Sequence, residues 1–312
     1  MTRHLLLLLR STEQLNEFIR ADCQYPRGRR QRMPNLILDH EAAIRLGLFL
    51  CVLGGVAGWE ALAPRRKRTL SRWRRWPSNL GIVTLNTALL RFAQPVAAIG
   101  LAALGEERGW GLLNGIDLPL WARIVLAILL LDLAIYLQHV MFHAVPALWR
   151  LHRMHHADLD IDVTTGARFH PVEILLSAGL KLAVVAAIGA PAVAVLVFEV
   201  LLNATSMFNH GNVALPSGID RVLRWIVVTP DMHRVHHSIV PAETNSNFGF
   251  NLPWWDRLLG TYRAQPAAGH EGMTIGITSF RDPKELRLDR MLIQPILGAT
   301  ESYPIDRRNA SA

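Results

Sequence analysis

Histidine is the residue type in this chain whose number and spacing could do chemistry. Ten of the 13 histidines lie between residues 139 and 237. His139 and His143 are spaced H-x-x-x-H; the spacing H-x-x-H-H occurs at His152, His155 and His156 and again at His233, His236 and His237; His170 and His210 stand alone. Side chains three and four residues apart share one face of a helix. Random placement would give H-x-x-H-H only about 0.02 times per chain, so the pattern predicts a functional site.

The number of imidazoles predicts a site for two metal ions. One ion takes four to six ligands, so ten histidines suit two ions, and neutral imidazole binds iron, zinc, copper or nickel. The two cysteines, Cys23 and Cys51, are too few for a four-thiolate site. H-E-x-x-H, typical of zinc hydrolases, is absent. Two compact triplets do not suit the axial pair of a haem.

The most economical chemistry for such a site is a pair of irons that binds dioxygen and oxidises a C–H bond of a lipid. A zinc-dependent membrane hydrolase, a metal transporter and an inactive membrane scaffold that keeps its histidines are the alternatives. A transporter would place its ligands near the bilayer midplane, whereas these histidines follow or precede the apolar stretches.

Four apolar stretches must position the histidines, and each approaches the roughly 20 residues that a spanning helix requires. They are residues 44–62, residues 80–104 with Arg91 and Pro95, residues 120–143, and residues 171–207. The last stretch is too long for one crossing and contains Gly189-Ala190-Pro191 near its middle. We therefore expect a hairpin of two helices that turns at these residues.

The hairpin contains two charged residues at equal distance from its turn. Lys181 lies nine residues before Ala190, and Glu199 lies nine residues after it. An isolated charge in hydrocarbon is costly and is usually neutralised by a neighbour. The sequence therefore predicts that Lys181 and Glu199 pair, the alternative being that each faces protein or water separately.

The basic residues predict the orientation of the spans. Residues 105–119 and 189–191 hold one basic residue, Arg108, whereas residues 63–78, 144–169 and those after 211 are rich in arginine and should be cytoplasmic. All ten histidines then gather at the cytoplasmic face. The seven arginines of residues 1–32 disagree with this topology. We expect residues 1–32 to be an extension without a role in the fold, with Met33 as the alternative start.

The composition agrees with a membrane protein. Of the 312 residues only 19% are charged, and the mean hydropathy is +0.21. The net charge of +8 could indicate nucleic-acid binding, but the basic residues form short blocks beside apolar runs, which favours membrane topology. We expect an all-α integral membrane protein with four to five transmembrane helices, including the hairpin, and a histidine-rich helical cytoplasmic cap.

The order of motifs resembles the fatty acid hydroxylase / sterol desaturase superfamily. After the first two histidine groups come His-Pro-x-Glu at 170–173, Asn-His-Gly at 209–211, the second H-x-x-H-H, Asn-Phe-Gly at 247–249 and Trp-Asp-Arg-Leu-Leu-Gly-Thr-Tyr at 255–262. The similarity covers about residues 35–265. Many members have an acidic residue after the first histidine group, whereas position 144 here is Ala. A carboxylate ligand at that point is therefore in doubt.

The resemblance implies a non-haem di-iron oxygenase of a membrane, with dioxygen as co-substrate and a lipid or sterol-like substrate. Its metal ligands would be His139, His143, His152, His155, His156, His233, His236 and His237, with His170 and His210 as the ninth and tenth. Electrons would come from a separate protein or a diffusible reductant. Hydroxylation is preferred on resemblance, and desaturation on the same site is the alternative. Residues 33–265 would form the hydroxylase domain in a bacterial inner membrane, and residues 266–312 a cytoplasmic tail.

Several polar and aromatic residues are candidates for supporting roles. Asp132 shares a helical stripe with Tyr136, His139 and His143, and would orient a ligand or hold the fold together. Glu173 and Asp231 flank histidines and would accept a histidine N–H or cap a helix. The aromatic residues Trp254, Trp255 and Tyr262 would pack the cap or lie at the membrane interface.

Overall fold

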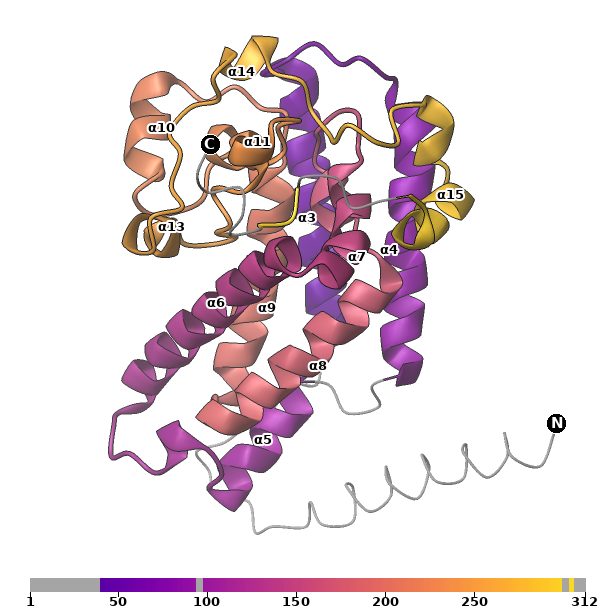
Figure 1. Cartoon of the computed structure of the whole chain (residues 1–312). Helices are drawn as coiled ribbons and strands as arrows, with labels where there is room; N and C mark the ends of the chain where they lie inside the picture. Colours follow the sequence, from indigo (N-terminus) through magenta and orange to yellow (C-terminus); the bar gives the residue numbers. More distant parts are fainter. Residues whose placement is uncertain (1–39, 94–97, 299–302, 306–312) are drawn as a thin grey trace, which may run out of the picture.

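A bundle of long helices carries a cap of short ones (Figure 1). The structure is a computed structural model that describes residues 40–93, 98–298 and 303–305. The bundle consists of α3 (Glu41–Leu62), α4 (Arg72–Ala93), α5 (Ala98–Arg108), α6 (Leu120–Ala144), α8 (Pro171–Ile188) and α9 (Ala192–Asn209). The cap contains α7 (Pro146–His156), α10 (Ser217–Leu223), α11 (Pro230–His236), α12 (Pro241–Thr244), α13 (Trp254–Leu258), α14 (Gly269–Gly272) and α15 (Leu288–Ile293). Short 3₁₀ turns occur at Leu112–Asn114, Thr165–Ala167 (η2), Pro283–Leu286 and Gln294–Ile296.

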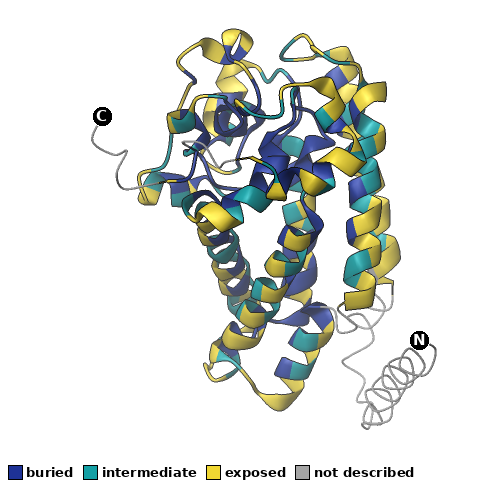
Figure 2. Cartoon of the chain, turned by 45° about the vertical axis from the view of Figure 1, so that its right-hand side comes forward, coloured by how far each residue is buried: buried dark blue, intermediate teal, exposed yellow. Residues whose placement is uncertain are grey.

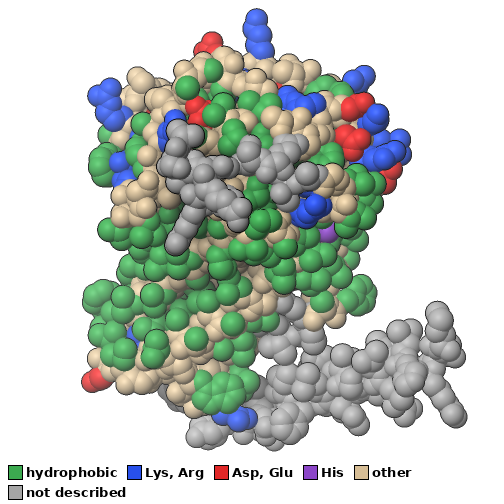
Figure 3. Space-filling model, in the orientation of Figure 1, with side chains coloured by type: hydrophobic (Ala, Val, Ile, Leu, Met, Phe, Trp, Pro, Cys, Tyr) green, Lys and Arg blue, Asp and Glu red, His purple; other side chains and the backbone are tan. Residues whose placement is uncertain are grey.

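Within the part of the chain that the structure describes, five segments are long and apolar enough to cross a membrane, as predicted. They are Ala42–Leu62, Arg72–Asn114, Leu120–Ala144, Pro171–Ile188 and Ala192–Asn209. Hydrophobic side chains cover the bundle half of the face shown in Figure 3, whereas most charged side chains gather on the cap. Buried residues concentrate inside the cap and where the bundle helices meet (Figure 2). The described chain is an all-α integral membrane protein. Residues 1–32 and Pro95, which entered the predictions, lie outside the described residues.

The predicted hairpin is confirmed. Helix α8 ends at Ile188 and α9 begins at Ala192. Gly189 terminates α8 in the left-handed conformation with φ of 63°, which glycine adopts without a steric penalty. A Cβ atom at this position would lie 2.4 Å from the carbonyl oxygen of Trp110, so only glycine fits this close approach.

The predicted pairing of the two hairpin charges is also confirmed. The ammonium of Lys181 donates to one carboxylate oxygen of Glu199, and the guanidinium of Arg45 on α3 donates to the other. Glu199 is buried. One carboxylate therefore ties three helices together between apolar surfaces.

A second buried ion cluster attaches the cap to the bundle. Arg75 of α4 donates to both carboxylate oxygens of Asp158, at 2.7 Å each, and to Asp162 at 2.6 Å. Although burial raises the pKa of Asp158, the guanidinium groups of Arg75 and Arg168 lower it to about 2. Asp158 lies two residues after His156, so this ion cluster holds the chain that follows the triplet of His152, His155 and His156.

The cap also includes chain beyond residue 265. Arg153 of α7 donates to the carbonyl oxygen of Gln294 at 2.6 Å. Met291 of α15 packs in a buried cluster with Ile82 of α4 and Met154 of α7. The segment predicted as a cytoplasmic tail thus covers the outer side of α7 as far as the structure describes it.

Candidate metal centre

Nine histidines form two buried groups in which the ring nitrogens converge. His139, His143, His152, His156 and His236 form the five-histidine group, and His155, His210, His233 and His237 form the four-histidine group. In each group, one nitrogen per residue lies within 4.8 Å of those of all the other members. The two groups are adjacent, because the rings of His156 and His237 stack with centroids 4.6 Å apart.

Helix geometry explains how the histidine triplets divide between the groups. In α7, His152 and His156 are four residues apart and both enter the five-histidine group, while His155 enters the other. The other triplet lies at the end of α11 and contributes the other way round. Its first and last members, His233 and His237, enter the four-histidine group, and His236 enters the five-histidine group. Each triplet therefore contributes to both groups.

The spacing of the nitrogens fits metal coordination. The Nε2 atoms of His139 and His152 are 3.0 Å apart, and the Nε2 atom of His210 is 3.1 Å from those of His155 and of His233. Two nitrogens bound at right angles to an ion, each at about 2.1 Å, would lie about 3 Å apart. Such short contacts between imidazole nitrogens suit lone pairs that point at a common cation.

Several buried ring nitrogens have no hydrogen-bond partner among the described residues. They are Nε2 of His143 and His236, Nδ1 of His233, and both nitrogens of His156 and His237. A buried polar atom without a partner costs about 1–3 kcal/mol. A bound cation would satisfy one nitrogen of each ring, so the residues present fit a metal site.

Most of the other ring nitrogens pair with oxygen atoms of residues that surround the two groups. In the five-histidine group, the Nδ1 atoms of His139 and His236 pair with the carbonyl oxygens of Phe248 and Ser246 at 2.7 and 2.8 Å. His152 Nδ1 lies 2.6 Å from Glu173 Oε1, and His143 Nδ1 lies 3.0 Å from Asn245 Oδ1.

The four-histidine group has backbone acceptors only. His155 Nδ1 pairs with the carbonyl oxygen of Arg168 at 3.0 Å, and His210 Nδ1 with that of Ser206 at 2.6 Å. A carbonyl oxygen accepts a hydrogen bond and cannot donate one, so these contacts place the proton on Nδ1 and leave the Nε2 lone pair free to bind a metal.

Burial keeps the imidazoles of the cap neutral. Loss of hydration lowers the pKa of His152, His155, His156, His233, His236 and His237 well below the ordinary value, and neighbouring imidazoles lower the pKa further. Burial lowers the pKa of His210 to about 3. Metal ions bind the neutral form of imidazole, so the site is in its binding form at pH 7.

The structure places His170 outside both groups. Its Nδ1 atom accepts a hydrogen bond from Val172 N at the start of α8, and its Nε2 atom lies 3.2 Å from the carbonyl oxygen of Leu292. Both ring nitrogens therefore have partners away from the other nine histidines. The reason is local, because His170 is the residue that caps α8.

Comparison with known proteins agrees with this geometry. The fatty acid hydroxylase family model matches residues 124–261. The histidine-bearing region of this chain is thus similar to the fatty acid hydroxylase superfamily. The two histidine groups are the polar centre of this region, since all nine of their members lie within the matched residues.

The relatives that the chain resembles are lipid-modifying enzymes by name. An ornithine lipid hydroxylase, OlsE, of Rhizobium tropici is 34% identical over 160 residues, which are 51% of this chain and 47% of the relative. An alkylglycerol monooxygenase of Xenopus tropicalis is 26% identical over 225 residues, 69% of this chain and 47% of the relative. A cholesterol 25-hydroxylase of Rattus norvegicus is 27% identical over 150 residues, 47% of this chain and 49% of the relative. The chain thus spans about half the length of these relatives, and no solved structure matches it.

The predicted supporting residues of the site divide into two kinds. Glu173 contacts the ligand candidate His152 directly, as described above. Asp132 contacts no histidine of the two groups but accepts hydrogen bonds from Asn251 Nδ2 and Trp255 Nε1, both at 2.8 Å. Asp231 forms ion pairs with Arg65 and Arg234 and lies 3.5 Å from His270. Asp132 and Asp231 therefore hold the cap together and do not orient these ligands.

The aromatic residues of the last motif pack the cap. Trp254 Nε1 donates to the carbonyl oxygen of Trp225 at 2.7 Å. The guanidinium of Arg257 lies between the rings of Trp225 and Tyr262, 3.8 and 4.0 Å from their centroids. Trp255 reaches α6 through Asp132. The motif connects α10, α13 and the bundle.

The segment from Asn245 to Phe250 supports the site in a way that sequence reasoning missed. It supplies the amide of Asn245 and the carbonyl oxygens of Ser246 and Phe248 to three histidines. Asn247 adopts a φ of 52°, and its amide nitrogen donates to the carbonyl oxygens of Met232 and Arg263 at 2.8 Å each. The Asn-Phe-Gly motif was the available signal, but motif letters do not reveal which backbone oxygens face a ligand.

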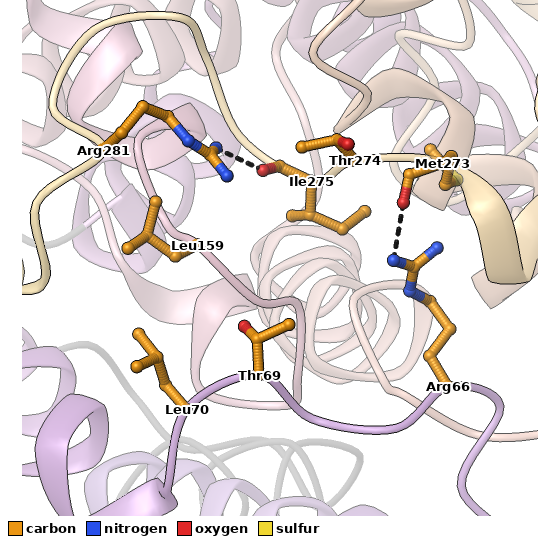
Figure 4. Close-up of a pocket in the computed structure, with 8 residues that line it drawn as sticks. All are labelled: Arg66, Thr69, Leu70, Leu159, Met273, Thr274, Ile275 and Arg281. Carbon is orange, nitrogen blue, oxygen red and sulfur yellow. Dashed lines mark hydrogen bonds between the residues drawn. The ribbon is translucent and has the colours of Figure 1, made fainter.

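A cavity of about 320 Å³ lies on the outer side of the cap (Figure 4). Arg66 donates to the carbonyl oxygen of Met273 and Arg281 to that of Ile275, both at 2.6 Å. The next residue, Gly276, donates its N–H to the carbonyl oxygen of His237 at 3.0 Å. The cavity is therefore separated from the histidines by one layer of backbone and contains none of the nine ligand candidates.

Proposed function

We propose that this protein is a membrane-embedded di-iron oxygenase that hydroxylates a C–H bond of a lipid or sterol-like substrate. The observation that carries the proposal is the pair of adjacent histidine groups, buried at the cap ends of α6 and α9. The names of the relatives support a lipid substrate and an oxygen-inserting reaction.

The number of ligands favours iron over zinc. Zinc sites are almost always four-coordinate, with three protein ligands where the ion is catalytic. A group of five imidazoles exceeds that number and suits an ion that accepts five or six ligands. We propose that the five- and four-histidine groups hold one iron each, and that His170 lies outside this set.

The reaction needs two electrons from outside the chain. Insertion of one oxygen atom into a C–H bond consumes dioxygen, two electrons and two protons, and releases water. The bound irons would supply the oxidising chemistry. The chain's own residues orient the imidazoles through Glu173, Asn245 and backbone carbonyls, and surround them with Phe248 and Phe250. We propose a separate redox protein or a diffusible reductant as the donor.

The basic residues of the cap side support a cytoplasmic location for the site. Arg65, Arg66, Lys67 and Arg68 follow α3 directly, where the chain enters the cap. Cytoplasmic loops of membrane proteins are enriched in lysine and arginine. We propose that the cap faces the cytoplasm of a bacterial inner membrane, with residues 33–265 as the catalytic domain.

The decisive experiment follows one oxygen atom into a lipid. Cells that lack the gene are complemented with wild-type protein or with His156→Ala/His233→Ala, and are grown under ¹⁸O₂. The proposal expects a lipid that gains one ¹⁸O atom with the wild type only, and two irons per chain in the purified wild-type protein. An unsaturated product without ¹⁸O would replace hydroxylation by desaturation. Unchanged lipids together with zinc in the purified protein would contradict the oxygenase.

A further inference from the structure

Two short helices of the cap, with the residues that follow each of them, expose a group of large apolar side chains. It consists of Val222, Trp225, Ile226, Trp254, Leu258 and Leu259, and we name it the α10–α13 surface. Val222 is 62% exposed and Leu258 is 75% exposed. The hydrogen bond from Trp254 Nε1 to the carbonyl oxygen of Trp225 joins α13 to the segment that follows α10. Large apolar side chains grouped in this way on a surface mark a site of interaction.

The arrangement of the helices forces these side chains outward. The other side of α13 is anchored, because buried Asp256 accepts hydrogen bonds from Phe248 N and Gly249 N at 2.8 and 2.9 Å. The other side of α10 is anchored by Arg224 at its C-terminal end, which pairs with Asp220 and donates to the carbonyl oxygen of Ala264 at 3.1 Å. The polar sides of both helices thus face the cap interior, and the large apolar side chains of the α10–α13 surface are exposed.

The location of the surface indicates its partner. Helix α13 is fixed to α6 by Trp255 Nε1 and Leu252 N, which donate to Asp132 at 2.8 and 3.3 Å. Asp132 lies midway along α6, about 18 Å from either end at 1.5 Å per residue. Trp121 and Val125, eleven and seven residues before Asp132 and so on the same face of α6, are exposed to the surroundings of the bundle. The α10–α13 surface therefore lies beside the lipid-facing side of a spanning helix (Figure 1).

The side chains of the surface also match a membrane interface. Tryptophan is enriched where the bilayer meets water. Exposed tryptophans occur at the cap end of the bundle, at Trp59 and Trp73, and at the opposite end, at Trp110 and Trp121. Trp225 and Trp254 add two more on the cap side. The cation nearest to them, Arg257, has its charge covered by aromatic rings.

We propose that the α10–α13 surface is immersed in the cap-side leaflet of the membrane. Its partner is lipid, and its immersion fixes the depth of the cap. The loop that precedes α13 carries Phe248 and Phe250, whose rings contact that of His139 at centroid distances of 5.5 and 4.9 Å. The lipid-anchored element is therefore continuous with the wall of the histidine centre. The immersion itself does not depend on the proposed reaction.

The test measures the surroundings of single side chains in lipid nanodiscs. In a Cys23→Ser/Cys51→Ser background, one cysteine is introduced as Val222→Cys or Leu258→Cys and labelled with an environment-sensitive fluorophore. Leu130→Cys on α6 is the lipid-facing control. Glu271→Cys on α14, whose side chain is 80% exposed, is the water-facing control. Each sample is titrated with acyl-chain doxyl lipid and with iodide.

Immersion predicts that doxyl lipid quenches the labels at 222 and 258 about as strongly as the label at 130. Iodide should quench the label at 271 several-fold more strongly than those at 222 and 258. Quenching of 222 and 258 by iodide alone would show a water-facing surface and overturn the proposal. Protection from both quenchers would show a protein partner or a second copy and would also overturn it. Leu259→Cys replaces any labelled variant that does not elute as the wild type does.

Discussion

The two histidine groups use the same residue type but are supported differently. In the five-histidine group, two side chains, Glu173 and Asn245, hold ring nitrogens in addition to two carbonyls. In the four-histidine group, only the carbonyls of Arg168 and Ser206 do so. Substitution of a side chain can therefore change the hydrogen bonds that orient the imidazoles of the five-histidine group. The orientation of the imidazoles in the four-histidine group depends on the surrounding backbone.

The difference in ligand number adds to this contrast. A four-histidine group leaves coordination positions open on an ion that accepts five or six ligands, whereas a five-histidine group leaves one at most. We expect the four-histidine group to offer more room to an exchangeable ligand such as water or dioxygen. The two groups are therefore not interchangeable halves of the site.

Removing one ligand from each group should have the largest effect. We expect His156→Ala and His233→Ala each to lower the iron content from about two to about one per chain and to abolish lipid oxidation, since the remaining nitrogens cannot replace the lost one. Inductively coupled plasma mass spectrometry of purified protein measures this. His170→Ala is the control and should retain both ions. Loss of iron from His170→Ala would mean that the ligand set is larger than the two groups.

A substitution in the backbone support should disturb the four-histidine group selectively. Gly166 of η2 packs against α9, and a Cβ atom there would lie 2.3 Å from the carbonyl oxygen of Ser206. That oxygen accepts the Nδ1 proton of His210. We expect Gly166→Ala to displace it, to destabilise the protein by about 3 kcal/mol, and to lower the iron content toward one.

The control for this prediction is Gly179→Ala on α8. No atom lies within 4 Å of a Cβ at that position, so the iron content should stay at its wild-type value, and the melting temperature should stay the same or rise slightly because alanine favours a helix more than glycine does. A Gly166→Ala protein with the wild-type iron content would show that the backbone support of His210 is dispensable.

Changing the carboxylate support should disturb the five-histidine group. Glu173 Oε1 holds His152 Nδ1 at 2.6 Å, and partners of this kind change metal affinity or activity by about 10- to 100-fold. We expect Glu173→Gln to weaken retention of one iron by this factor in a chelator competition, while Glu173→Asp gives partial rescue. Equal loss of both irons would contradict the separate support of the two groups.

The sequence predicts the histidines and the spans because both depend on local spacing. The i, i+3 and i+4 intervals and the runs of apolar residues are visible without coordinates, as is the turn at Gly189. The division of each triplet between two groups is not visible, since it depends on how α7 and α11 are placed relative to each other. The backbone acceptors Ser246 and Phe248 were missed for the same reason. His170 was grouped with the others by residue type, but its position at the start of α8 gives it other partners.

The smallest expected effect concerns the ion cluster of Arg75, Asp158 and Asp162. This cluster holds the loop that follows α7 and its histidines. The pKa of Asp158 is about 2, below its ordinary value of 3.8. A carboxyl group with a lowered pKa stabilises the fold above pH 3.8, and this stabilisation disappears as the pH falls through 2. The difference corresponds to about 2 kcal/mol.

Arg75→Met removes a principal cause of the lowered pKa of Asp158 and should lower the melting temperature at pH 6. Because protonation of Asp158 removes the same interaction in the wild type, the difference in melting temperature between the two proteins should shrink from pH 4 toward pH 2. Thermal unfolding in detergent over this range measures it. Lys181→Met is the matched control, since Glu199 keeps Arg45 as a second cationic partner. A difference between wild type and Arg75→Met that stays constant with pH would mean that Asp158 does not depend on Arg75.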